Sequence, residues 1–152
     1  MKKKIIIGIL IIAVIGLSYI AYLFFMPHRD VQATKAFAEK ESYELVQEFL
    51  NDRKKANELY LDNEGESKVL IIKGTVYSIN EDQLGQKVVL LKREEDKMGV
   101  SVTFMLETNN QLKNVKIGNV IKVKGVIRSG AEYDEDLDLA EHVIVEKAAI
   151  AY

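Results

Sequence analysis

The chain has 152 residues, about the size of one domain, and contains no cysteine. Without cysteine, a thiol nucleophile, a thiolate zinc site and a lipidated cysteine are all excluded. Three of the 21 basic residues are the lysines at positions 2–4, which leaves 18 against 23 acidic residues in the rest of the chain. This acidic remainder disfavours binding to phosphate backbones and to anionic lipid.

An uncharged and strongly apolar segment covers residues 5–25. At about 1.5 Å per residue it would extend over roughly 31 Å, close to the hydrocarbon thickness of a bilayer. The positive-inside bias keeps the preceding lysines in the cytoplasm. We therefore expect residues 1–26 to form a single-pass anchor in the cytoplasmic membrane, with the rest of the chain outside the cytoplasm. Expected anchor residues are Ile5, Leu10, Ile15, Tyr19, Tyr22 and Phe25.

A cleaved signal peptide is the alternative, because Gly16-Leu17-Ser18 is a weak small-x-small cleavage site. The apolar run continues well beyond Ser18 and is longer than the core of a signal peptide, which favours an uncleaved anchor. Residues 27–41 follow with mixed charge and no sustained period, and we expect them to form a stalk.

A helical pattern begins after Ser42, which can cap a helix. Its apolar residues recur at spacings of three and four, which predicts an amphipathic helix lying on the folded domain. These residues are Leu45, Val46, Phe49, Leu50, Ala56, Leu59 and Tyr60.

The rest of the chain has the pattern of strands. β-Branched residues and alternation predict five of them, over residues 69–79, 87–92, 100–105, 120–127 and 137–150. A glycine in the middle of the first strand allows it to bend, and a short helical connector is expected between the third and fourth. This order predicts a mainly β fold, a five-stranded OB-type barrel that forms one unit with the helix over residues 42–152. A small sandwich is the alternative.

Several short motifs occur along the chain: residues 27–31, Ala56-Asn57, Gly74-Thr75-Val76, residues 115–119 and Val123-Lys124-Gly125. In these motifs the chain resembles the tRNA-anticodon-like OB-fold family of small bacterial envelope proteins, whose function is largely unassigned. The resemblance implies an OB barrel and transfers no catalytic residue.

The chain departs from this family at two positions. Some relatives carry a cysteine in the third strand and another in the last, where this chain has Val102 and His142. A cross-strand disulfide is thus not available here. We expect His142 to be a packed histidine of the core or rim and not a metal ligand.

OB barrels bind ligands on the outer face of their second and third strands and in the adjoining loops. The candidate ligand-binding residues are Tyr77, Lys87, Ser101, Thr103 and Tyr133. Both adjoining loops, residues 80–86 and 128–135, are acidic. Together with the expected location, this argues against a nucleic-acid partner and favours an envelope protein. Nucleic-acid or oligosaccharide binding is the alternative.

The sequence contains no constellation typical of an enzyme. The only histidines are His28 and His142, and Ser129 lacks the context of a nucleophile elbow. Asp134, Asp136 and Asp138 alternate but do not fit the spacing of an EF-hand loop. We therefore expect a non-enzymatic binding module with no catalytic residue, no metal and no cofactor.

Overall fold

The computed structural model of this chain describes residues 12–22, 30–63 and 65–152. Residues 12–22 are helical, and the expected anchor residues Ile15, Tyr19 and Tyr22 lie there with side chains 60–63% exposed. Ile5, Leu10 and Phe25 lie outside the described residues. In the described parts of the chain, no helix combines the length and the apolar character needed to cross a membrane. Membrane anchoring therefore stays a prediction.

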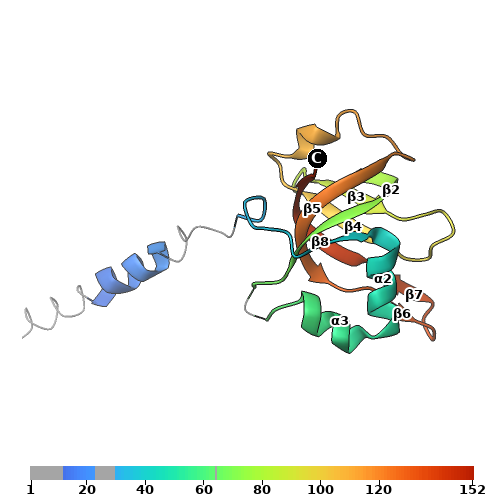
Figure 1. The fold of residues 1–152 in the computed structure, drawn as a ribbon. Coiled ribbons are helices and arrows are strands. Elements are labelled where there is room, and N and C mark those ends of the chain that lie inside the picture. The colour runs from blue at the N-terminus through green and yellow to red at the C-terminus, as the bar shows by residue number, and fades with distance from the viewer. Residues whose placement is uncertain (1–11, 23–29, 64) are drawn as a thin grey trace, which may run out of the picture.

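Five strands close into a barrel (Figure 1). They are β2 (Val69–Glu81), β3 (Lys87–Leu91), β4 (Val100–Phe104), β5 (Val120–Ser129) and β8 (Val143–Ile150). The hydrogen-bonded order is β2-β3-β4-β8-β5, and β5 pairs again with β2. Only the β4–β8 pairing among these is parallel. The predicted mainly β, OB-type barrel is confirmed, and the closed sheet excludes an open sandwich.

Alternation along β4 shows how the sequence builds this barrel. Val100, Val102 and Phe104 are fully buried, while Ser101 and Thr103 between them are partly exposed. In β2, Gly74 allows a close approach, since a Cβ there would lie 2.7 Å from Oγ of Ser42. The long strand thus closely approaches Ser42, the first residue of the helical segment that precedes it in the chain, at the position where the sequence predicts a bend.

Part of the segment that the sequence indicates to be a stalk is packed on the barrel. Val31 is 3% exposed and clusters with Val69 and Val126. Strand β1 (Ala38–Glu41) then pairs in parallel with the first half of β2. These residues therefore belong to the folded domain. The sequence does not indicate the pairing of β1 with β2, because the four residues of β1 have mixed charge and no strand-like pattern.

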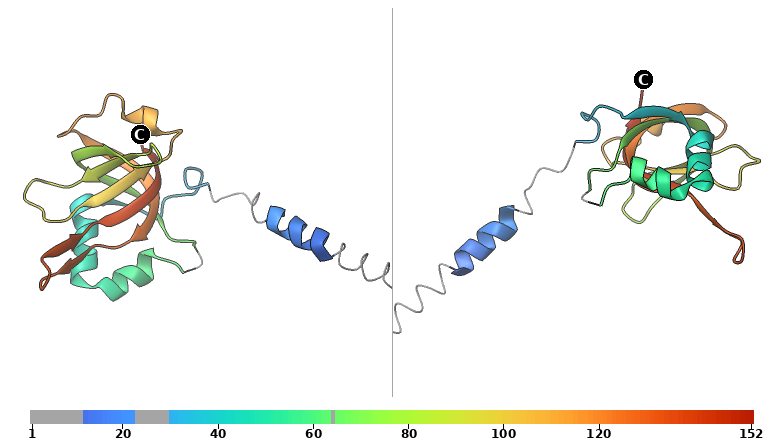
Figure 2. Two further views of the ribbon diagram at one scale, coloured as in Figure 1. Left: turned by 180° about the vertical axis from the view of Figure 1, so that it is seen from behind. Right: turned by 60° about the horizontal axis from the view of Figure 1, so that its bottom comes forward.

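Two helices, α2 (Ser42–Asn51) and α3 (Arg53–Tyr60), cover one end of the barrel (Figure 2, right). The sequence predicts one continuous pattern here, but the chain breaks at Asp52, whose side chain accepts from the N–H of Lys55 and caps α3. Ser42 is not the N-cap of α2, because Glu41 takes that place in a capping box with Glu44. The sequence assigns Leu50 and Leu59 to the packed side, but their side chains are 38% and 42% exposed.

The opposite end of the barrel carries the expected connector, which is the short 3₁₀-helix η1 (Asn109–Leu112). The last strand is not continuous as predicted. Residues 137–142 instead belong to a hairpin of β6 (Glu132–Asp134) and β7 (Leu139–Glu141) that precedes β8. Asp138 turns the chain there with φ of 47°, a backbone conformation that aspartate tolerates better than most residues.

Candidate functional site

The outward side chains of β3, β4 and β8 form one continuous surface, which we call the outer face: Val88, Leu90, Ser101, Thr103 and Ile144. The pairing register places Val88 opposite Thr103 and Leu90 opposite Ser101. Ser101 in turn lies beside Ile144 of β8, whose side chain is 41% exposed. The outer face is therefore apolar with interspersed hydroxyl groups, and the next outward residue of β8, Glu146, is charged and pairs with Arg128.

Two tyrosines lie at the borders of the outer face, and each is covered by a lysine. Tyr77 is at the irregularity between Val76 and Ser78 in the β2–β3 pairing, and Nζ of Lys92 lies 4.1 Å from its ring centroid. Nζ of Lys97 lies 4.4 Å from the ring centroid of Tyr133. These are cation–π contacts, so neither ring is a bare platform for a base.

Tyr133 also connects its hairpin to the loop between β3 and β4. The ammonium of Lys97 donates to its hydroxyl oxygen at 2.8 Å, and the hydroxyl donates to Oδ1 of Asp138 at 2.6 Å. The hydrogen bond with Tyr133, and after it the charges of Asp138 and Glu135, raise the pKa of Lys97. The lysine therefore stays charged while it joins the two loops.

A shallow pocket of about 350 Å³ adjoins the outer face. It is lined by Ser101, Ser129, Glu141, His142 and Ile144. The backbone N–H of Gly99 donates to Nδ1 of His142 at 3.3 Å, which assigns the proton of the neutral ring to Nε2. Burial, and then the charge of Lys92, hold the pKa of His142 below its usual range. The sequence analysis did not assign this pocket, whose residues come from four separate strands and the residue between β7 and β8.

Three cations around the outer face have anionic partners, whereas Lys92 donates to the backbone carbonyl oxygen of Asp96 at 2.7 Å. Lys87 pairs with Glu81 at 2.6 Å, Arg93 with Asp96 at 2.7 Å, and Arg128 with Glu146 at 2.9 Å. Binding of a nucleic-acid backbone requires cations that follow its path, and these pairs would first have to break. The electrostatic character of this surface is thus nearly neutral, with acidic loops beside it.

The five sequence-predicted site residues do not converge on one point. Ser101 and Thr103 lie on the outer face, Tyr77 and Tyr133 lie at its borders under their lysines, and Lys87 is held by Glu81. Sequence reasoning missed Val88 and Leu90. The run Val88-Val89-Leu90-Leu91 is apolar throughout, so no polar residue indicates which side of β3 faces outward.

Comparisons with known proteins agree with this fold. The tRNA_anti-like family model matches residues 1–135. Among solved structures, a lipoprotein from Klebsiella pneumoniae, provisionally described as nucleic acid-binding, matches with a TM-score of 0.52 and 16% identity, over 84% of this chain and 100% of that chain. These values show a shared fold. No curated protein sequence matches the chain.

Weaker structural matches cover parts of other proteins. A protein from Leishmania major provisionally described as an aspartyl-tRNA synthetase matches with a TM-score of 0.44 and 13% identity, over 82% of this chain and 22% of that chain. The Stn1-ten1 complex of S. pombe matches with a TM-score of 0.38 and 18% identity, over 55% of this chain and 57% of that chain.

Proposed function

We propose that this chain, which belongs to the tRNA_anti-like family of OB-fold binding domains, is a non-enzymatic module that is anchored in the cytoplasmic membrane and uses its outer face to bind a protein of the cell envelope. The anchoring rests on the apolar segment 5–25 and on the lysines before it. The same features favour the extracytoplasmic side for the barrel, where proteins and saccharides are the common partners.

The observation that carries the choice of a protein partner is the chemistry of the outer face. Val88, Leu90 and Ile144 form an apolar centre on neighbouring strands, with hydroxyl groups between them. Charged groups lie around this centre and not within it. An apolar centre with few charges inside a polar rim is the usual composition of a protein–protein interface.

The test is site-specific cross-linking in intact cells. A photoreactive phenylalanine derivative at Leu90 is expected to capture a protein partner, whereas the same group at Lys54, exposed on α3, is the matched control and should not. A Leu90→Asp substitution should leave the fold intact because the side chain points outward, but should abolish capture by a reactive group at Thr103. Recovery of nucleic acid alone would contradict the proposal.

Oligonucleotide binding is the second candidate, supported by the tyrosine–lysine pairs on either side of the outer face. A base could stack on Tyr77 if Lys92 moved to a phosphate, and the Klebsiella pneumoniae protein of similar fold is described in these terms. Titration of the full chain in detergent with labelled oligonucleotides at low salt tests this. Saturable binding that Tyr77→Ala weakens would support it, and the absence of such binding would remove it.

A further inference from the structure

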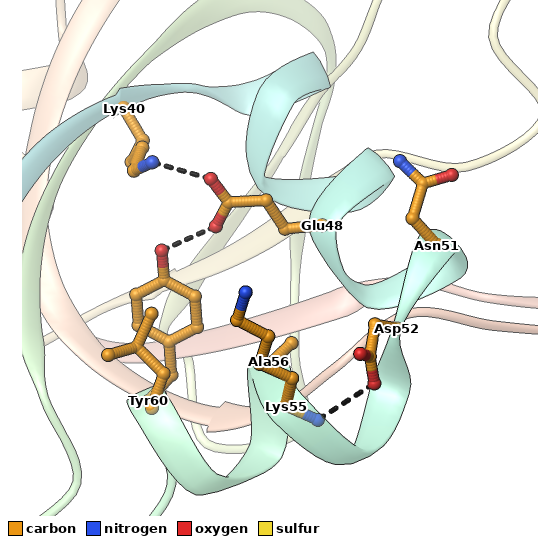
Figure 3. Close-up of a pocket in the computed structure, with 8 residues that line it drawn as sticks. Lys40, Glu48, Asn51, Asp52, Lys55, Ala56 and Tyr60 are labelled. Atoms are coloured by element: carbon orange, nitrogen blue, oxygen red, sulfur yellow. Dashed lines mark hydrogen bonds and ion pairs between the residues drawn. The ribbon is translucent and has the colours of Figure 1, made fainter.

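A pocket of about 340 Å³ lies at the helix-covered end of the barrel, between β1, α2 and α3 and away from the outer face (Figure 3). Its apolar walls are Ala56, Leu59 and the ring of Tyr60, which is itself only 1% exposed. Ligand pockets usually measure about 300–1,000 Å³ and combine apolar walls with a few polar groups. The size therefore suits a small molecule or a single terminal residue.

Both carboxylate oxygens of Glu48, which lines this pocket, already accept hydrogen bonds. One oxygen of Glu48 accepts from Nζ of Lys40 at 2.5 Å, and the other accepts from the hydroxyl of Tyr60, also at 2.5 Å (Figure 3). At the rim, Oδ1 of Asp52 accepts from the backbone N–H of Lys55 at 3.0 Å. The hydrogen-bond acceptors of the pocket are thus largely occupied by its own donors.

The ionised state of Glu48 follows from the same contacts. Burial alone raises the pKa of Glu48, but the hydrogen bonds from Lys40 and Tyr60, with the charge of Lys40, outweigh burial and bring it below its usual range. Burial and the hydrogen bond to Glu48 raise the pKa of Tyr60. Glu48 is therefore a carboxylate and Tyr60 a neutral phenol at neutral pH, and neither offers a free proton to a ligand.

Lys55 is different from the other cation of the pocket. In Figure 3 its side chain extends from α3 toward the space beside Tyr60. Within residues 12–22, 30–63 and 65–152, its ammonium has no hydrogen-bond or ion-pair partner. The amide of Asn51, also in the lining, is a second donor that no described residue occupies. The ammonium of Lys55 and the amide N–H groups of Asn51 are therefore available to an occupant that carries acceptors.

We propose that this pocket binds a carboxylate attached to a compact apolar body. The carboxylate accepts from Lys55, and the apolar body lies on Ala56 and Leu59. Lys40 and Tyr60 already donate to both oxygens of Glu48, so the negative charge of Glu48 is balanced and repels a second carboxylate less. The ammonium of Lys55 is then available to pair with the carboxylate of the ligand. A free carboxylic acid and the C-terminal residue of a peptide share this chemistry.

This site is independent of the partner surface proposed above. Its lining comes from β1, α2 and α3, whereas the outer face is made by β3, β4 and β8. Loss of carboxylate binding would therefore leave cross-linking from Leu90 unchanged, and a failure of one proposal can be told from a failure of the other.

The experiment titrates the full chain in detergent micelles and follows the methyl NMR signals of Ala56 and Leu59. The probes are 4-methylpentanoate and N-acetyl-alanyl-leucine, each compared with its carboxamide. Both acids are expected to give saturable shifts, and each amide should bind at least about tenfold more weakly, a difference of about 1.4 kcal/mol. Tighter binding of the dipeptide would identify a peptide C-terminus as the source, and tighter binding of the short acid would identify a free acid.

Lys55→Gln should weaken the binding of both acids about tenfold and leave the binding of the carboxamides unchanged. Lys54→Gln, on the exposed side of the same helix, is the matched control and should change neither. Glutamine and lysine have similar helix propensities, so both variants should fold. Equal binding of acid and amide by the unmodified chain, equal effects of the two substitutions, or no saturation at millimolar concentration would each overturn the proposal.

Discussion

Gly99 and His142 are joined by a hydrogen bond of 3.3 Å in which the backbone N–H donates to Nδ1 of the ring. This bond ties the loop before β4 to the residue before β8, next to the pocket on the outer face. A protonated ring would carry a hydrogen on Nδ1 and lose the bond. Lys92 faces the ring as a like charge, and burial opposes ionisation as well.

The first prediction concerns the pH dependence of stability. Because the pKa of His142 is lowered in the folded state, the unfolded chain takes up a proton first as the pH falls below about 6.5, so the free energy of unfolding should decrease there. His142→Asn keeps an acceptor for Gly99 but does not titrate. Thermal unfolding between pH 8 and pH 5 should show a smaller decrease for the variant, and equal decreases would contradict the assignment.

A second prediction concerns the contact of Gly130 with Phe49. A Cβ on Gly130 would lie 2.1 Å from Cδ1 of Phe49, which is 1% exposed. Gly130→Ala should therefore destabilise the chain by about 1–3 kcal/mol through overpacking. Combined with Phe49→Leu, which makes room, the loss measured by urea unfolding should be smaller than the sum of the two single losses. If the loss in the double variant equals the sum of the two single losses, the contact between residue 130 and residue 49 is not the cause of the destabilisation.

The hydroxyl of Tyr60 is the subject of a third prediction. Tyr60→Phe removes the hydrogen bond to Glu48 and keeps the ring, so it should lower the free energy of unfolding by about 0.5–1.5 kcal/mol. Tyr43→Phe is the control because Tyr43 is 43% exposed, and its effect should stay within about 0.5 kcal/mol. Denaturant titration at neutral pH compares them, and a loss no greater than that of the control would mean that the bond contributes nothing.

A fourth prediction tests how the N-terminal segment is held to the barrel. The side-chain amide of Gln32 donates to the carbonyl oxygens of Lys124 at 3.1 Å and Lys147 at 2.8 Å. Gln32→Ala should release this segment locally, and trypsin should then cleave faster after Lys35. Gln83→Ala, in an exposed loop, serves as the control. Unchanged cleavage would indicate that the remaining contacts hold the segment, namely the burial of Val31 and the hydrogen bond from Nζ of Lys124 to the carbonyl oxygen of Gln32 at 2.7 Å.

The order of the barrel strands could be predicted from local sequence patterns. The alternation of Val100, Val102 and Phe104 with Ser101 and Thr103 specifies both a strand and its buried side. Where apolar and polar residues do not alternate, the sequence does not show which side of a strand is buried or where a strand ends. The all-apolar run in β3 hides its outward residues, and the polar stretch around Asp138 hides a hairpin. Hydrophobic periodicity depends only on residues that are close in sequence. It therefore cannot predict the turn at Asp138, which depends on a single positive φ angle.

The sequence by itself determined an acidic domain with the strand order of an OB barrel and an apolar N-terminal segment. Only the tertiary structure decided where chemistry is concentrated. Lys40 from β1, Glu48 from α2 and Tyr60 from α3 meet in one network, and Lys55 lies beside it without a partner among the described residues. Such a site depends on how separate elements pack, because hydrogen bonds between distant residues leave no periodic trace along the chain.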